Sequence, residues 1–146
     1  MQQISNVRAA AVAGMFYPRH AQALREQVEA CLRAGPVGAG GEPGMDAARR
    51  PKLLVVPHAG YVYSGAVAGQ AHARLRAHAA AIRRVVVLGP AHRGALRGLA
   101  LPAHDAFETP LGRVAVDAAA RAALADQPQV TTSAAAHAEE HSNEVP

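Results

Sequence analysis

Two short apolar runs constrain the fold of this chain more than any other feature. The runs are Lys52–Val56 and Val85–Leu88, and both are typical of strands that are buried on each face. Between them, the helical spacing of apolar residues predicts a helix from Ser64, its expected N-cap, to about Ala80. Strand, helix and strand together make a βαβ unit with parallel strands and a right-handed crossover. We therefore expect an α/β fold with a central parallel or mixed sheet and flanking helices.

Other segments carry local signals that predict short elements. The expected elements are a helix over Arg19–Arg33, strands at Leu99–Leu101 and Val114–Val116, a turn at Thr109–Gly112, and a helix that Asp117 caps and that ends near Asp126. No further strand or helix is expected over residues 137–146. Cys31 lies on the apolar face of the first helix, so we expect a buried structural thiol.

Length and composition favour one ordinary domain. The chain has 146 residues and is 50% hydrophobic, which excludes intrinsic disorder. Residues 35–51 contain five Gly and three Pro, and we interpret them as a surface loop within a single domain over residues 1–146. No apolar run reaches the ~18 residues of a membrane span, and the N-terminus lacks the order of a signal peptide. We therefore expect a cytoplasmic protein without membrane contact.

The charge pattern argues against a nucleic-acid partner. The formal net charge is +4, and only five residues are aromatic. The arginines are scattered, and the aromatic residues are too few for a base-stacking platform. We therefore expect no specific binding of DNA or RNA.

Two histidines follow the two predicted strands. His58 comes two residues after the first strand and His92 four residues after the second. Parallel strands bring their carboxyl ends to one edge of the sheet, where ligands bind in open α/β folds. Both imidazoles can reach one point there, and a metal ion is a reasonable occupant. Tyr61 and Tyr63 follow His58 directly and are expected to line the same pocket.

A competing pattern lies near the end of the sequence. His137 and His141 enclose two glutamates in the order His-x-x-Glu-His, which a class of zinc proteases also shows. The pattern is short, and Ala-rich surface helices match it by chance. We therefore interpret Glu139, Glu140 and Glu144 as a solvated charged face.

Five short motifs resemble those of the MEMO family, whose bacterial and archaeal members are often named AmmeMemoRadiSam system protein B. They follow the family's order and together span nearly all of the chain. The motifs are Ala13–Pro18, Pro57–Gly65, Gly89–His92, Phe107–Gly112 and Ala138–Ser142.

The resemblance implies an α/β fold shared with class III extradiol ring-cleavage dioxygenases, together with a metal pocket. By motif, His58 and His92 would be two metal ligands, and His141 would be a nearby pocket residue and the candidate catalytic group. Iron or copper is the metal that the resemblance suggests. In the dioxygenase relatives two histidines and a carboxylate hold Fe(II), whereas in the MEMO branch the third ligand is often a cysteine.

Members of that family run well past the length of this chain, and their later half carries the third ligand. We therefore expect a fragment that forms an incomplete, truncated version of the fold. We also expect that the third protein ligand is absent from this chain.

Two functions remain open at this point. The first is a MEMO-like metal-binding protein with an iron- or copper-dependent redox or dioxygenase-like activity. The second is a non-catalytic module that binds a peptide or another small ligand in the same pocket. The sequence leaves undecided whether the protein is an enzyme, which substrate it takes and which oligomer it forms.

Overall fold

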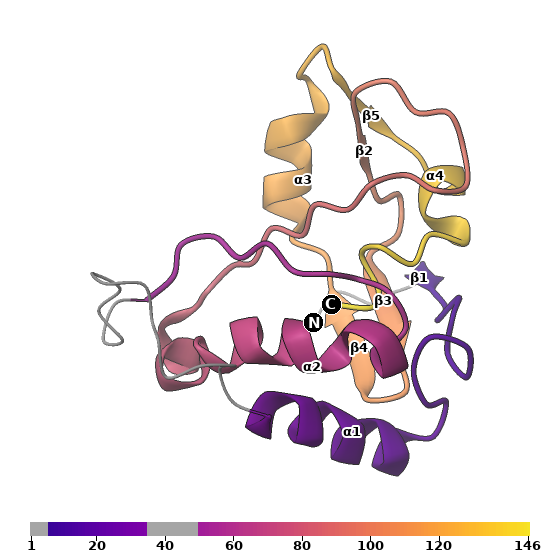
Figure 1. Cartoon of the computed structure of the whole chain (residues 1–146). Coiled ribbons are helices and arrows are strands. Elements are labelled where there is room, and N and C mark those ends of the chain that lie inside the picture. The colour runs from indigo at the N-terminus through magenta and orange to yellow at the C-terminus, as the bar shows by residue number, and fades with distance from the viewer. Residues whose placement is uncertain (1–5, 35–49) are drawn as a thin grey trace.

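The computed structural model describes residues 6–34 and 50–146, which form a mixed α/β structure (Figure 1). In chain order the elements are β1 (Val7–Arg8), α1 (Ala21–Arg33), α2 (Tyr61–Ala73), the 3₁₀ helix η1 (Arg76–Ala81), β2 (Leu99–Leu101), β3 (Ala106–Thr109), β4 (Gly112–Ala115), α3 (Ala118–Ala125), β5 (Val130–Thr132) and α4 (Ala135–Ala138). The α/β class expected from the sequence is confirmed. Most of the loop predicted at 35–51 lies outside the described residues, so this loop and the single domain remain predictions.

The strands form two small sheets. In the first, β3 pairs in parallel with β1 and antiparallel with β4. In the second, β2 pairs in parallel with β5. The turn predicted at Thr109–Gly112 joins β3 to β4, and the strands predicted at 99–101 and 114–116 match β2 and β4. No strand is predicted at β1, β3 or β5.

Helices α1 and α2 pack against each other through glycines (Figure 1). A Cβ atom on Gly69 would lie 2.5 Å from the carbonyl carbon and oxygen of Cys31, so a larger residue at position 69 would push the helices apart. The helix predicted at 19–33 is confirmed as α1. Cys31 lies at this helix contact and is partly rather than fully buried.

The start and end of α2 differ from the prediction. The helix begins at Tyr61, with Gly60 rather than Ser64 at the N-cap. Ser64 lies buried in the first turn, where its Oγ donates a hydrogen bond to the carbonyl oxygen of Ala59 at 2.8 Å. The α-helix ends at Ala73, and a separate 3₁₀ helix continues toward residue 81.

The two strands predicted at 52–56 and 85–88 are wrong for the described part of the chain. Neither segment joins a sheet among the described residues, and Figure 1 draws both as coil. Val55 is 89% exposed and Val86 is 74% exposed. A strand needs a hydrogen-bonded neighbour and cover for its apolar face. Without these, the expected βαβ unit and its crossover do not form.

The last third of the chain confirms one local prediction and corrects another. Asp117 is the N-cap of α3, and its Oδ1 accepts a hydrogen bond from the backbone N–H of Ala120 at 2.9 Å. The sequence predicts no element over residues 137–146, but α4 (Ala135–Ala138) extends into this stretch, and β5 (Val130–Thr132) forms before it where nothing was predicted. Both are short, so neither leaves a periodic signal in the sequence.

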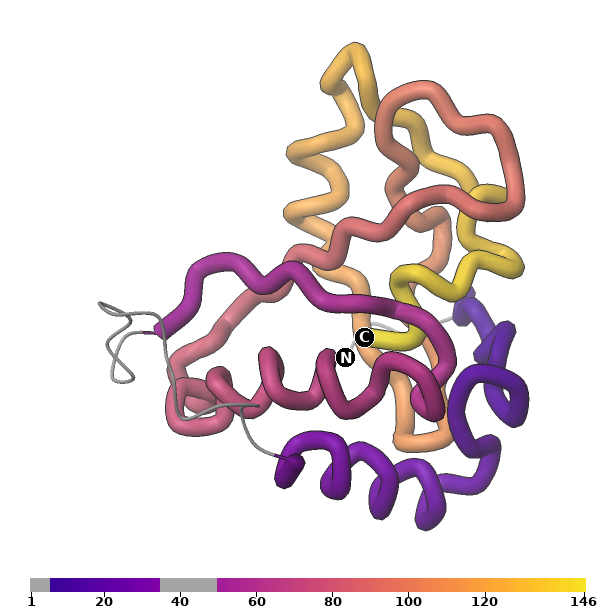
Figure 2. Tube along the Cα trace, viewed as in Figure 1, coloured from indigo at the N-terminus to yellow at the C-terminus, as the bar shows by residue number. Residues whose placement is uncertain are grey.

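The buried apolar core joins the two ends of the chain. Val12, Tyr17, Leu24 and Val145 form it. In Figure 2 the yellow C-terminal segment runs back to the indigo N-terminal segment, and side-chain hydrogen bonds join the two. Within the described ranges, no helix is both long enough and apolar enough to cross a bilayer.

Candidate metal centre

Three histidines from three separate loops lie together. The ring centroids of His58 and His92 are 5.3 Å apart, and those of His58 and His141 are 5.6 Å apart. The rings of His92 and His141 stack at 4.4 Å with an angle of 21° between their planes. One ligand atom from each ring lies within 4.8 Å of the other two. The three side chains are therefore close enough to hold a metal ion.

The two histidines that the sequence predicted to meet do lie near each other, but for a different reason. No sheet among the described residues carries His58 or His92. His141, which the sequence analysis placed beside the metal ligands, supplies a third imidazole from within this chain. His92 is held instead by a carboxylate of the His141 loop, and His141 packs on Phe16 of the N-terminal segment.

Glu140 holds His92 at two points. Its Oε2 accepts a hydrogen bond from the backbone N–H of His92 at 2.6 Å, and its Oε1 lies 2.8 Å from the ring Nδ1. The same Oε1 accepts hydrogen bonds from the backbone N–H groups of His141 and Ser142, at 2.9 and 3.0 Å. One buried carboxylate thus connects two of the three histidine loops.

The charge of Glu140 determines the tautomer of His92. Burial opposes ionisation of this carboxyl, but hydrogen bonds from His92 and from the Ser142 backbone outweigh it and hold its pKa well below the ordinary value. An ionised carboxylate only accepts hydrogen bonds, so Nδ1 of His92 carries the proton. In the neutral ring the lone pair of His92 is therefore on Nε2, the nitrogen left to bind a metal.

A close backbone contact brings the His92 loop onto the His141 loop. A Cβ atom on Gly89 would lie 2.7 Å from Cβ and 2.3 Å from Oγ of Ser142. The Ser142 Oγ donates a hydrogen bond to the carbonyl oxygen of Pro90 at 2.8 Å. Only glycine leaves room for Ser142 at this point.

His141 is largely shielded from water. Its side chain is 15% exposed, and the ring of Phe16 lies 4.6 Å away between centroids. Burial, together with the neighbouring His92, lowers the pKa of the His141 imidazole below its ordinary value. The neutral form is therefore favoured, and this is the form that coordinates a metal.

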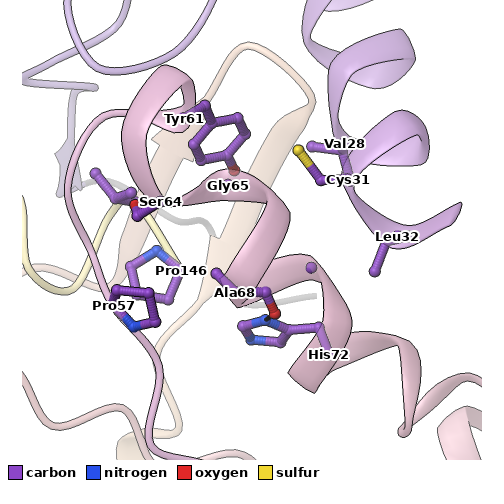
Figure 3. Close-up of a pocket in the computed structure, with 12 residues that line it drawn as sticks. Val28, Cys31, Leu32, Pro57, Tyr61, Ser64, Gly65, Ala68, His72 and Pro146 are labelled. Atoms are coloured by element: carbon purple, nitrogen blue, oxygen red, sulfur yellow. Dashed lines mark hydrogen bonds between the residues drawn. The ribbon is translucent and has the colours of Figure 1, made fainter. Parts of the chain in front are cut away.

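The two candidate pocket tyrosines lie in different surroundings. Tyr63 is 86% exposed on the surface of α2. Tyr61 packs against the core and lines an apolar cavity of about 250 Å³ (Figure 3). Tyr61, Cys31 and Pro57 all line this cavity, and the Tyr61 ring faces Cys31. Their role as pocket residues of the metal centre stays a prediction.

The competing His137–His141 pattern does not form a site. Helix α4 ends at Ala138, so the two histidines do not share a helix. His137 is buried, and its pKa is lowered mainly by that burial. The neutral ring donates from Nε2 to the carbonyl oxygen of Ala100 at 3.1 Å and accepts at Nδ1 from Asn143 at 2.8 Å. Both ring nitrogens of His137 are therefore occupied by hydrogen bonds within the protein.

The expectation of a solvated acidic face holds for one glutamate of three. Glu139 is exposed. Glu140 is buried beneath His92, and the carboxylate of Glu144 forms a buried ion pair with Arg8. No periodicity marks these two glutamates, because both lie in irregular loops and their partners are far away in the sequence. Sequence reasoning therefore missed them.

Comparison with known proteins places this arrangement in a family. The profile of the family described as Memo-like protein matches residues 8–146. The chain belongs to the Memo-like family. The match includes all three histidines of the cluster and both segments, N-terminal and C-terminal, that surround it.

Relatives within the family include longer chains from archaea and bacteria. A MEMO1 family protein of Methanothermobacter thermautotrophicus is 39% identical over 140 residues, which cover 95% of this chain and 50% of the relative. A MEMO1 family protein of Aquifex aeolicus is 36% identical over 139 residues, 95% of this chain and 47% of the relative. The chain thus spans about half the length of these relatives.

Proposed function

We propose that this Memo-like chain is a metal-binding protein that uses His58, His92 and His141 as ligands. The observation that carries the proposal is the convergence of three imidazoles from three loops, with one of them oriented by a buried carboxylate. We further propose a redox-active ion, iron or copper, as the resemblance to the MEMO family implies. Imidazole donors suit both metals.

The donor set fits such an ion. Metal–nitrogen bonds of ~2.0–2.1 Å place two ligand nitrogens at most ~4.2 Å apart. The three ligand atoms lie within 4.8 Å of one another, so small rotations of the rings bring them to this spacing. Three protein ligands leave coordination positions for a small molecule.

Glu140 and His92 have different roles at the proposed metal centre. Glu140 holds the proton of His92 on Nδ1 and so reserves Nε2 for the ion. His92 is 39% exposed, which gives a small molecule a path from solvent. A bound iron or copper ion would supply Lewis-acid and one-electron redox chemistry.

Metal analysis tests the proposal directly. The purified chain and its His58→Ala/His92→Ala variant are loaded with Fe(II) or Cu(II), passed over a desalting column and analysed for metal. We expect one ion per chain in the unchanged protein and at least a tenfold loss in the variant. The matched control, His20→Ala/His78→Ala, removes two histidines outside the cluster and should retain the ion. Equal, near-zero metal in all three proteins would overturn the proposal.

The cavity beside Tyr61 supports a second candidate function. Its walls are mainly apolar and its volume of about 250 Å³ suits a small ligand. Under this alternative the chain binds a small molecule or peptide and performs no redox chemistry. Oxygen uptake with a panel of catechols separates the two functions: the iron-loaded chain should consume O₂ if the centre is catalytic, and a pure binding module should leave it unchanged.

A further inference from the structure

The buried guanidinium of Arg8 contacts the loop that carries Glu140 and His141. The residue is 3% exposed, although it lies in the short strand β1. Its Nε donates to the carbonyl oxygen of His137 at 2.9 Å and its Nη2 to that of Glu140 at 2.5 Å. Its Nη1 pairs with the carboxylate of Glu144. One side chain therefore binds this loop at three points.

Glu144, which pairs with Arg8, also binds the N-terminal segment directly. Its two carboxylate oxygens accept hydrogen bonds from the backbone N–H groups of Ala11 and Val12 at 2.9 and 3.0 Å. The hydroxyl of Tyr17 also donates to Glu144. With Arg8, these four donors surround one carboxylate whose side chain is 2% exposed. The positions of residues 8–17 and of residues 137–144 thus depend on each other.

Phe16 contacts both His141 and the segment that follows His58. Its ring packs on the ring of His141 at 4.6 Å. Its carbonyl oxygen accepts a hydrogen bond from the backbone N–H of Tyr61 at 2.7 Å, at the start of the helix that follows His58. Two of the three histidine loops are therefore held by residues 8–17.

We propose that Arg8 and Glu144 are positioning residues of the metal centre, which fix the loop 137–144 so that Glu140 and His141 face His92. This inference rests on the proposed function, because its first test measures how tightly the three histidines bind a metal. The planar guanidinium reaches three acceptors at once because its five N–H donors point in fixed directions. A lysine ammonium at position 8 keeps the charge beside Glu144 but cannot match this planar set of contacts.

Comparing arginine with lysine at position 8 distinguishes an effect on metal affinity from an effect on folding stability. Arg8→Lys keeps a positive charge beside Glu144 but leaves a buried carbonyl oxygen of the loop without its donor, so the variant should still fold, with a modestly lower urea midpoint. It loses carbonyl contacts of the loop, so we expect its affinity for Co²⁺, followed by visible absorption, to fall about tenfold, the lower range for outer-shell changes. A merely structural role would change the affinity only in step with stability.

A charge-free variant and a matched control complete the design. Arg8→Met/Glu144→Met removes both buried charges together, so neither is left unpaired; it should fold but bind Co²⁺ at least tenfold more weakly. The control Arg76→Met/Glu29→Met removes an ion pair that is about half exposed, and its Co²⁺ affinity should not change. If either Arg8 variant folds and binds Co²⁺ as the unchanged chain does, the proposal is overturned.

A metal-free measurement distinguishes this inference from the proposed function. In ¹⁵N spectra of histidine-labelled chain, Nδ1 of His92 should carry a proton bonded to Glu140, and cross-relaxation should connect the rings of His92 and His141. Arg8→Lys should weaken both signals. If the unchanged chain binds no metal but these signals respond, only the proposed function fails. If the signals are identical in both proteins, the positioning role fails.

Discussion

The carboxylate of Glu140 contacts His92 through both of its oxygens, one at the ring Nδ1 (2.8 Å) and one at the backbone N–H (2.6 Å). This pair sets both the position and the tautomer of an imidazole that lies next to two others. Carboxylate–histidine pairs of this kind typically orient metal ligands.

Replacing Glu140 with Gln should weaken metal binding about 10- to 100-fold, the range for loss of an outer-shell partner. The amide keeps one acceptor oxygen and places an NH₂ donor where the second oxygen lay, so either the ring Nδ1 or the backbone N–H of His92 loses its acceptor. Isothermal titration with Zn²⁺ measures the effect. The control Glu139→Gln changes an exposed neighbour and should bind Zn²⁺ normally. Equal affinities in the two variants would contradict the role given to Glu140.

Replacing Gly89 with Ala should separate the His92 and His141 loops. The new Cβ would lie 2.7 Å from Cβ of Ser142, and overpacking of this kind costs about 1–3 kcal/mol. We expect a lower urea midpoint together with weaker Zn²⁺ binding. Gly94→Ala is the matched control, because a Cβ there meets nothing within 4 Å. If both variants unfold at the same urea concentration, the contact with Ser142 is not required.

Local signals in the sequence predicted local structure well. The helical spacing over 19–33, the capping carboxylate of Asp117 and the turn at 109–112 all depend on residues close together in the chain. Each of these elements forms where the sequence indicates. The meeting of His58 and His92 was also predicted, but from a strand pairing that the described structure does not contain.

Long-range contacts explain why the rest was missed. Arg8 and Glu144 are 136 positions apart, and nothing in either local pattern indicates a buried ion pair. Glu140 lies in an acidic stretch that is typical of a surface, yet it is buried by the loop of His92. The segments 52–56 and 85–88 have the composition of buried strands, but composition does not supply a neighbouring strand.

The exposure of these two segments leads to a stability prediction. Val55→Thr should change the free energy of unfolding by less than about 0.5 kcal/mol, because the side chain is 89% exposed. Val12→Thr places the same hydroxyl in the core, where Val12 is 4% exposed, and should cost at least ~1 kcal/mol. Urea unfolding of both variants makes the comparison. A large loss for Val55→Thr would show that the segment is packed in solution.

The pKa of Glu144 gives the chain a predictable response to acid. Burial opposes ionisation of this carboxyl, but hydrogen bonds from Tyr17, from two backbone amides and from Arg8 hold its pKa below the ordinary 4.5. The unfolded chain therefore binds the proton more tightly than the folded chain. Stability from this group is present above the ordinary pKa and is lost as the pH falls below it.

Comparison of the unchanged chain with Glu144→Gln isolates this response. Near pH 7 the variant should be less stable, because Arg8 loses its buried counter-charge. As the pH falls below 4.5, Glu144 takes up a proton in the unfolded form of the unchanged chain before it does so in the folded form, so the stability difference between the two proteins should shrink. Urea unfolding at pH 7, 5.5, 4.5 and 3.5 follows the difference, and Glu139→Gln corrects for an exposed carboxylate. A difference that stays constant from pH 7 to 3.5 would show that the charge of Glu144 does not stabilise the fold.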